Sequence, residues 1–349
     1  MAAVTDYVGG TTEQVSAQPR VGKVPEQAQV WLNRGAALAV QWRLEEALAA
    51  FEEALKQRPD CSLAWYDKGT TLGELGQYDE ALAALDEALR LSPDYPDAWD
   101  NKGIALSALG RAEEALACHE QAIQLDPTVA NYWHNKGVTL GKLGRVKEAL
   151  SAIDQALQLQ PEYRDAWHNR AAALGELGRY EEALQALNEA LLLSPDYAQG
   201  WYNKGVALEK LGRFEEARQA WKQALALKDQ LADQGAKVYL NLGALLVVEG
   251  LRHVQTRALE EAEETAREFI GLRRRAKDKR MGKVMDEAIN EVKAELSRKE
   301  LKLFDEFQLM LTILSIEDPT ERWKALAEKI SEKWPRGLSA VEAIRKERE

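Results

Sequence analysis

The chain has 349 residues, 46% of them hydrophobic, and its 57 acidic and 46 basic side chains give a net charge of -11. Residues 26–229 carry the whole excess, with 32 acidic and 21 basic side chains. Nucleic acid is therefore not expected as the main ligand of this region, because phosphate binding requires local positive charge. No uninterrupted apolar run is long enough to span a membrane, so no membrane segment is expected.

The N-terminal segment, residues 1–27, has neither the basic start nor the apolar core of a secretory signal, and we expect it to be disordered. Cys61 and Cys118 are the two cysteines, too few for a disulfide framework. These features predict a cytoplasmic protein.

From residue 28 onward the chain repeats itself. Tryptophan occurs at residues 31, 65, 99, 133, 167 and 201, which are steps of 34 residues. Within the third unit, the apolar spacing after Trp99 predicts one helix, Gly110 interrupts it, and a second amphipathic helix runs to Asp126-Pro127. Each unit is therefore expected to be helix, turn, helix, turn.

Small residues recur in register with the tryptophans and allow neighbouring helix backbones to approach closely. We expect the tryptophan to fill the space beside them. In the first helix of each unit they are Gly35, Gly69, Gly103, Gly137, Ala171 and Gly205, and in the second they include Ala47, Ala81, Ala115, Ala149, Ala183 and Ala217. The turn glycines, suited to a left-handed helix C-cap, are Gly76, Gly110, Gly144, Gly178 and Gly212.

This combination of Trp, Gly, Ala and Pro at a period of 34 residues resembles the tetratricopeptide repeat. The resemblance implies an all-α fold in which helical hairpins stack into a right-handed superhelix with a concave face. Full repeats begin near residues 28, 62, 96, 130, 164 and 198. Tyr239, Asn241 and Gly243 restate the spacing in a diverged seventh unit, residues 236–270, that would end the array at residues 28–270. Residues 271–349 are expected to form a helical C-terminal region.

The family's concave face comes mainly from the first helix of each repeat. With the tryptophan numbered position 4 of a repeat, the helical wheel places positions 2, 5, 6, 9, 12 and 13 on the side away from the core. Position 6 is a row of carboxamides with one carboxylate: Asn33, Asp67, Asn101, Asn135, Asn169, Asn203 and Asn241. Further candidate contacts at positions 5 and 9 are Tyr66, His134, His168, Tyr202, Ile104 and Val138.

An asparagine side chain offers one acceptor and two donors, the hydrogen-bonding pattern of a peptide group. The row therefore predicts pairing with the main chain of an extended ligand, and it resembles the asparagine ladder of some tetratricopeptide superhelices. The alternative is structural, with each asparagine bonding only a neighbouring helix. Position 12 is small in most repeats, which would give a wide groove with a small or apolar floor.

Other kinds of site find less support. Positions 5 and 9 carry no Lys or Arg with which to clamp a ligand's carboxylates, and the basic row that includes Lys68 and Lys136 falls at position 7, at the edge of the core. His134 and His168, one repeat apart, are interpreted as solvated groove residues rather than metal ligands. No catalytic motif occurs, so we expect no enzyme, no cofactor, no metal and no catalytic residue.

The C-terminal third leaves alternatives open. The basic run RRRAKDKR, residues 273–280, is either a solvated helical face or a contact for nucleic acid or an acidic partner. The apolar residues 302–316 are expected to pack on the bundle or on another subunit, and the tail 334–349 faintly resembles toxin-binding segments of small bacterial antitoxins.

The sequence as a whole favours a protein-interaction scaffold that holds a peptide or protein segment. The alternative is a regulatory module whose C-terminal helices bind a toxin-like partner, nucleic acid or a second copy.

Overall fold

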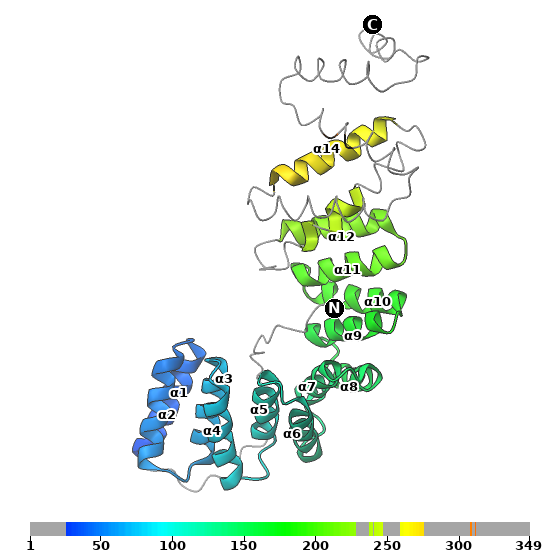
Figure 1. Cartoon of the computed structure of the whole chain (residues 1–349). Coiled ribbons are helices and arrows are strands. Elements are labelled where there is room, and N and C mark those ends of the chain that lie inside the picture. The colour runs from blue at the N-terminus through cyan, green and yellow to red at the C-terminus, as the bar shows by residue number, and fades with distance from the viewer. Residues whose placement is uncertain are drawn as a thin grey trace, which may run out of the picture. The chain divides into compact units, whose positions relative to one another are not determined.

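The computed structural model describes residues 26–227, 237–239, 241–246 and 259–275, together with residues 308 and 311 (Figure 1). The expectations for residues 1–25 of the N-terminal segment, for most of the basic run and for the C-terminal helices after residue 275 lie outside this part of the chain. Residues 26 and 27, expected to be disordered with the N-terminal segment, instead begin the first helix. The described part is helical and contains no strand, as the repeat predicted.

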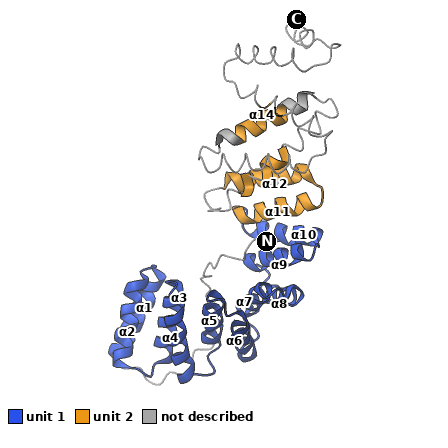
Figure 2. Ribbon diagram, in the orientation of Figure 1, with its two compact units in different colours: residues 1–195 blue, residues 196–349 orange. Residues whose placement is uncertain are grey.

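Consecutive helices form antiparallel pairs, one pair per repeat. The bounds are α1 Glu26–Val40, α2 Leu44–Gln57, α3 Ser62–Glu74, α4 Tyr78–Leu91, α5 Pro96–Ala108, α6 Ala112–Leu125, α7 Ala130–Lys142, α8 Val146–Leu159, α9 Arg164–Glu176, α10 Tyr180–Leu193, α11 Ala198–Lys210, α12 Phe214–Ala226 and α14 Leu259–Arg275. The chain divides into two compact units, residues 1–195 and 196–349, so the boundary falls between the fifth and sixth repeats (Figure 2).

The turn between the two helices of a repeat takes the conformation that its glycine predicted. Gly76 has φ 76° and Gly110 has φ 78°, and the next residue's N–H bonds back into the helix, as in Arg111 N to Leu106 O at 2.9 Å. In the first repeat the same position holds Trp42, with φ 57° and an exposed indole. A side chain with a Cβ is strained in this left-handed region.

Four of the repeated tryptophans lie half-buried at the joins between successive repeats of the first unit. The Trp133 Nε1 donates a hydrogen bond to the Pro127 carbonyl at 2.9 Å, and Trp65, Trp99 and Trp167 make the same bond to their preceding prolines. The Lys136 ammonium lies 5.8 Å from the Trp133 ring centroid and pairs with Glu120 at 2.9 Å. This arrangement confirms that the basic row at position 7 lies along the edge of the core, with its charge at the surface.

The space beside the helix glycines is filled by the partner helix of the same repeat, so the expectation that tryptophan fills it was wrong. A Cβ added at Gly69 would lie 2.7 Å from Leu85 Cγ, and one at Gly137 would lie 2.6 Å from Ile153 Cγ1. The residue that closes this gap is always 16 positions after the small residue, because the two helices of the hairpin cross there. These residues are Phe51, Leu85, His119, Ile153, Leu187 and Trp221.

Within the first unit, each odd-numbered helix contacts the odd-numbered helix of the next repeat, for example α5 with α7 and α7 with α9. No pair of successive even-numbered helices contacts as extensively in the described part of this unit. The odd helices are therefore the more closely spaced layer, which is the inner layer of a curved stack. Cys61 and Cys118 are both buried and free. None of the described helices is long and apolar enough to cross a membrane.

The second unit begins with the sixth repeat, α11 and α12. Trp221 of α12 is fully buried under Gly205 and donates from Nε1 to the Tyr202 carbonyl at 3.2 Å. Residues 237–239 and 241–246 are helical and mostly buried, and Lys222 of α12 pairs with Glu268 of α14 at 2.7 Å.

Replacing Gly137 with alanine tests the close helix contact. The added methyl group would meet Ile153 and the Ala149 carbonyl, and we expect a loss of stability of about 1–3 kcal/mol, the usual cost of overpacking. Gly141→Ala is the matched control on the same helix, because an added Cβ there has no neighbour within 4 Å. Removing that helical glycine should increase stability by about 0.5–1 kcal/mol. Urea midpoints followed by circular dichroism measure both changes, and equal midpoints would contradict the packing argument.

Candidate functional site

The predicted site residues of the first unit lie on the inner layer of helices. We call this surface the odd-helix face, meaning positions 2, 5, 6, 9, 12 and 13 of α1, α3, α5, α7 and α9. Asn33 is exposed and accepts a hydrogen bond from Gln29 at 2.9 Å. The other predicted residues of this unit are half-buried: Tyr66, Asp67, Asn101, Ile104, His134, Asn135, Val138, His168 and Asn169.

Three of the asparagines donate to the preceding repeat. The Nδ2 of Asn101 donates to the Tyr66 hydroxyl at 3.1 Å and to Thr70 Oγ1 at 3.0 Å. Asn135 Nδ2 donates to Asp100 Oδ2 at 2.8 Å, and Asn169 Nδ2 to His134 Nε2 at 2.8 Å. In each case the amide reaches a position-5 side chain 35 residues earlier, so the amide nitrogens join neighbouring repeats.

The carboxamide oxygens of Asn101 and Asn169, unlike their nitrogens, do not join neighbouring repeats. Asn101 Oδ1 and Asn169 Oδ1 accept no hydrogen bond from the described residues, and neither atom is sealed from solvent. Asn101 and Asn169 therefore each have two roles. Their amide nitrogens hold adjacent helices together, and their carboxamide oxygens remain accessible acceptors.

His134 is a neutral, fixed side chain rather than a solvated one, which corrects the sequence interpretation. Burial lowers the pKa of His134 to about 4, so the ring is uncharged at neutral pH. Its Nε2 accepts from Asn169, which leaves Nδ1–H to donate to the Tyr163 hydroxyl at 3.1 Å. The Tyr163 ring also packs on the imidazole at a centroid distance of 4.7 Å.

His168 also differs from the sequence interpretation. It is half-buried, and burial lowers its pKa to about 4. Both histidines of the face are therefore neutral at pH 7. Among the described residues, no group of three or more His, Cys, Asp or Glu side chains is arranged to hold a metal ion.

A buried pair that was not predicted from the sequence involves position 5 of the third repeat, whose side chain turns from the face toward α6. His119 of α6 is 1% exposed and its Nδ1 lies 2.7 Å from Oδ1 of Asp100, which is 5% exposed. The signal was present in the sequence, because His119 is the one histidine in the column of gap-filling residues that otherwise reads Phe, Leu, Ile, Leu and Trp. Asn135 completes the arrangement by bonding the other Asp100 oxygen.

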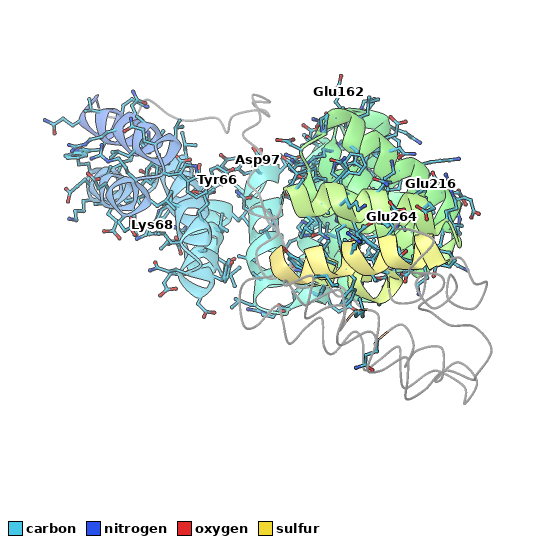
Figure 3. The ribbon with its side chains drawn as sticks, turned by 90° about the horizontal axis from the view of Figure 1, so that it is seen from above. Tyr66, Lys68, Asp97, Glu162, Glu216 and Glu264 are labelled. Carbon is cyan, nitrogen blue, oxygen red and sulfur yellow. The ribbon has the colours of Figure 1, made fainter. Side chains whose placement is uncertain are left out.

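Tyr95 and Tyr163, which directly precede odd helices, pack on position-5 side chains, whereas Tyr132 of α7 bonds a residue at position 2. Tyr95 is buried and its ring packs on Tyr66 at 4.7 Å between centroids. The buried Tyr132 donates its hydroxyl to Asp97. Figure 3 shows Tyr66 and Asp97 close together where α3 and α5 meet, with Lys68 on another side of its helix. Burial is the main cause that raises the pKa values of Tyr66 and Tyr95, and nearby acids contribute, so both hydroxyls stay protonated.

Asp67 differs from the other members of the row. Its carboxylate makes no hydrogen bond or ion pair with the described residues, and burial raises the pKa of Asp67 to about 7. The reason lies in the preceding repeat, where position 5 is Leu32, which has no group for a carboxylate to bond.

The remaining predicted residues lie in the second unit. Asn203 accepts a hydrogen bond from Gln199 Nε2 at 3.2 Å. Tyr202 is buried, and burial raises the pKa of its hydroxyl, an effect that the Asn241 side chain partly offsets. Asn241 therefore lies near the position-5 residue of the repeat before it, as Asn101, Asn135 and Asn169 do.

The buried His119–Asp100 pair predicts a non-additive pair of substitutions. His119→Leu leaves a buried carboxylate without one partner, and we expect a loss of about 3 kcal/mol, typical of breaking a buried pair. Adding Asp100→Tyr recreates the tyrosine and leucine of the second repeat, Tyr66 and Leu85, and should recover most of that loss. Denaturant unfolding of both variants measures the effect. A double variant as unstable as the sum of the single changes would contradict the pairing.

Asp67→Asn should stabilise the protein increasingly as the pH rises. The folded-state pKa of about 7 lies above the ordinary value of 3.8, so Asp67 reduces native stability progressively as the pH rises through this interval. The difference in melting temperature between variant and wild type should therefore be small near pH 4 and largest above pH 7. Asp79→Asn, at an exposed site on α4, is the control and should change stability little. A difference in melting temperature that stays constant with pH would argue against a desolvated Asp67.

Comparisons with known proteins agree with this architecture. Models of the tetratricopeptide repeat match residues 28–61, 66–130, 134–191 and 198–230, and a further TPR repeat model matches residues 173–212. No curated protein matches the chain.

Two solved structures with TM-scores above 0.5 share this fold at low sequence identity. PilW, a type IV pilus biogenesis factor, is 22% identical with a TM-score of 0.55, over 58% of this chain and 94% of PilW. The Cut9–Hcn1 structure from the APC/C is 22% identical with a TM-score of 0.54, over 61% of this chain and 43% of the other. A thermophilic TPR protein of Thermus thermophilus is 26% identical with a TM-score of 0.46, over 52% and 98%. Because the repeat models together match more than half of the chain, it belongs to the tetratricopeptide repeat family, whose members serve as protein-interaction scaffolds.

Proposed function

We propose that this protein is a non-enzymatic scaffold that binds an extended peptide or protein segment along the odd-helix face. The observation that carries the proposal is the divided use of the asparagine row. Asn101 and Asn169 are held by their amide nitrogens, while their carboxamide oxygens remain solvent-accessible acceptors. Acceptors that are already oriented can pair with the N–H groups of an extended main chain without losing side-chain entropy on binding.

The face also has room for a ligand backbone. A Cβ added at Gly73, Gly141 or Gly175 would have no neighbour within 4 Å, and none of these helical glycines has a positive φ. Each glycine lowers helix stability by about 0.5–1 kcal/mol relative to alanine, and the fold gains no packing from it. A close approach of another backbone is the physical use for a helical glycine in open space.

The side chains around the row would make the contacts depend on ligand sequence. Ile104 and Val138 at position 9 offer half-buried apolar surface between the asparagines. His134 is neutral and its ring is fixed on both sides, so it presents aromatic surface rather than charge. A ligand with apolar side chains beside each main-chain contact would fit this pattern.

Gly141→Leu separates binding from folding. The leucine would project from α7 into the open face, so we expect folding stability to be retained or slightly increased, while binding falls at least tenfold. The ligand source is a peptide display library panned on the immobilised full chain, and affinities of enriched peptides are then measured by fluorescence polarisation. Ala117→Leu places the same side chain at an exposed position of the even helix α6 and should leave affinity unchanged.

Two outcomes would reject the proposal. The first is a library that yields no enriched peptide on the wild-type chain. The second is a set of enriched peptides that bind the Gly141→Leu variant as well as the wild type, because the contact would then lie elsewhere on the chain.

A further inference from the structure

Asp67 occupies a position where an asparagine would be expected to bond the preceding helix. Asn101, Asn135 and Asn169 each find a polar position-5 partner on the helix before them. Asp67 instead follows α1, whose corresponding residue is the buried Leu32. The carboxylate therefore has no internal partner among the described residues, and its role is not to join repeats.

The same carboxylate remains open to a ligand. Neither Asp67 oxygen is sealed from solvent, although the surrounding atoms desolvate the group enough to raise its pKa to about 7. Further along α3 the face is open at Gly73, where an added Cβ would meet nothing within 4 Å. An incompletely solvated carboxylate without an internal partner is well placed to gain from a partner of opposite charge.

The charged side chains at the face positions of α3 and α5 are all acids. On its own helix Glu74 is exposed, although partial desolvation raises the pKa of its carboxyl group, while α5 contributes Asp97 and Asp100. The two acids of α5 are engaged, Asp97 with Tyr132 and Asp100 with His119 and Asn135. The titratable groups Tyr66 and Tyr95 are protonated, and the corresponding positions of α1 carry no charge.

No base on this face neutralises these acids within the first three repeats. Positions 2, 5, 6, 9, 12 and 13 of α1, α3 and α5 contain no Lys or Arg. Lys142, at position 13 of α7, donates to Ser107 Oγ at 2.9 Å, and burial lowers its pKa. The basic row at position 7 is also occupied, since Lys68 pairs with Glu52 at 3.0 Å and Lys102 with Asp86 at 2.6 Å.

We propose that the segment bound by this face is basic, and that one of its lysine or arginine side chains pairs with Asp67 between the first and third repeats. The inference rests on the proposed peptide-binding function and adds the chemistry of the partner. A cationic head group would supply the hydrogen bonds that Asp67 lacks, and an asparagine at this position could not replace the charge. An acidic segment would meet Asp67 and Glu74 and be repelled.

Peptide selection on two chains tests this inference. A display library is panned in parallel on the full-length wild type and on Asp67→Asn, which has nearly the same shape and matches the rest of the row. We expect peptides from the wild type to be enriched in Lys or Arg at one position, and this enrichment to disappear with Asp67→Asn. Asp79→Asn on α4 removes an exposed acid outside the face and serves as the control that should keep the enrichment.

A binding measurement on one enriched peptide then isolates the charge pair. Replacing its basic residue with norleucine or citrulline should weaken binding to the wild type about tenfold, and to Asp67→Asn by less than twofold. Wild-type affinity should also rise as the pH increases from 6 to 8, because Asp67 ionises over that range. The Asp67→Asn chain should lack this rise.

The failures of the two proposals are distinguishable. If peptides are enriched without a basic residue, or the same basic residue is enriched on Asp67→Asn, the Asp67 pairing is wrong while peptide binding stands. If no peptide is enriched on any chain, or if Gly141→Leu binds the enriched peptides unchanged, the proposed function fails and the charge pairing fails with it.

Discussion

The close approach of the two helices within each repeat is the contact on which the other features depend. At Gly69 or Gly137 no Cβ fits, because Leu85 or Ile153 from the partner helix already fills that space. This contact sets the separation of the hairpin, and stacking the hairpins then places each tryptophan over the loop that precedes it. Trp133, bonded to the Pro127 carbonyl and covered by Lys136, fixes that join rather than the hairpin.

The gap-filling position also shows how a local substitution spreads through the structure. In the third repeat the filler is His119, a polar ring in a place where the other repeats are apolar or carry Trp221. A buried imidazole requires a partner, and Asp100 supplies it from position 5. Asp100 in turn receives the Asn135 amide, so the internal packing of one repeat determines what the next repeat's asparagine bonds.

The odd-helix face therefore combines stability and recognition in the same side chains. Amide nitrogens of the row connect the repeats, and at Asn101 and Asn169 the oxygens remain available. Asp67 lacks such a connection because position 5 of the preceding repeat is Leu32. Its carboxylate, the one charged group of the row, therefore has no hydrogen-bond partner among the described residues, and burial raises its pKa. A uniform 34-residue pattern thus produces a face whose first repeats differ chemically from the later ones.

Most of the fold could be predicted from periodicity, because stacked repeats contact mainly their sequence neighbours and one unit's pattern constrains all of them. The turn glycines, the prolines and the place of Lys136 at the core edge followed from spacing alone, and so did the sidedness of Asn135 and His134. Hydrogen bonds between side chains 35 residues apart, the burial that keeps His134 neutral, and the pairing of His119 with Asp100 did not. Those depend on distances between helices and on which atoms water can reach, quantities that exist only once the hairpins are packed.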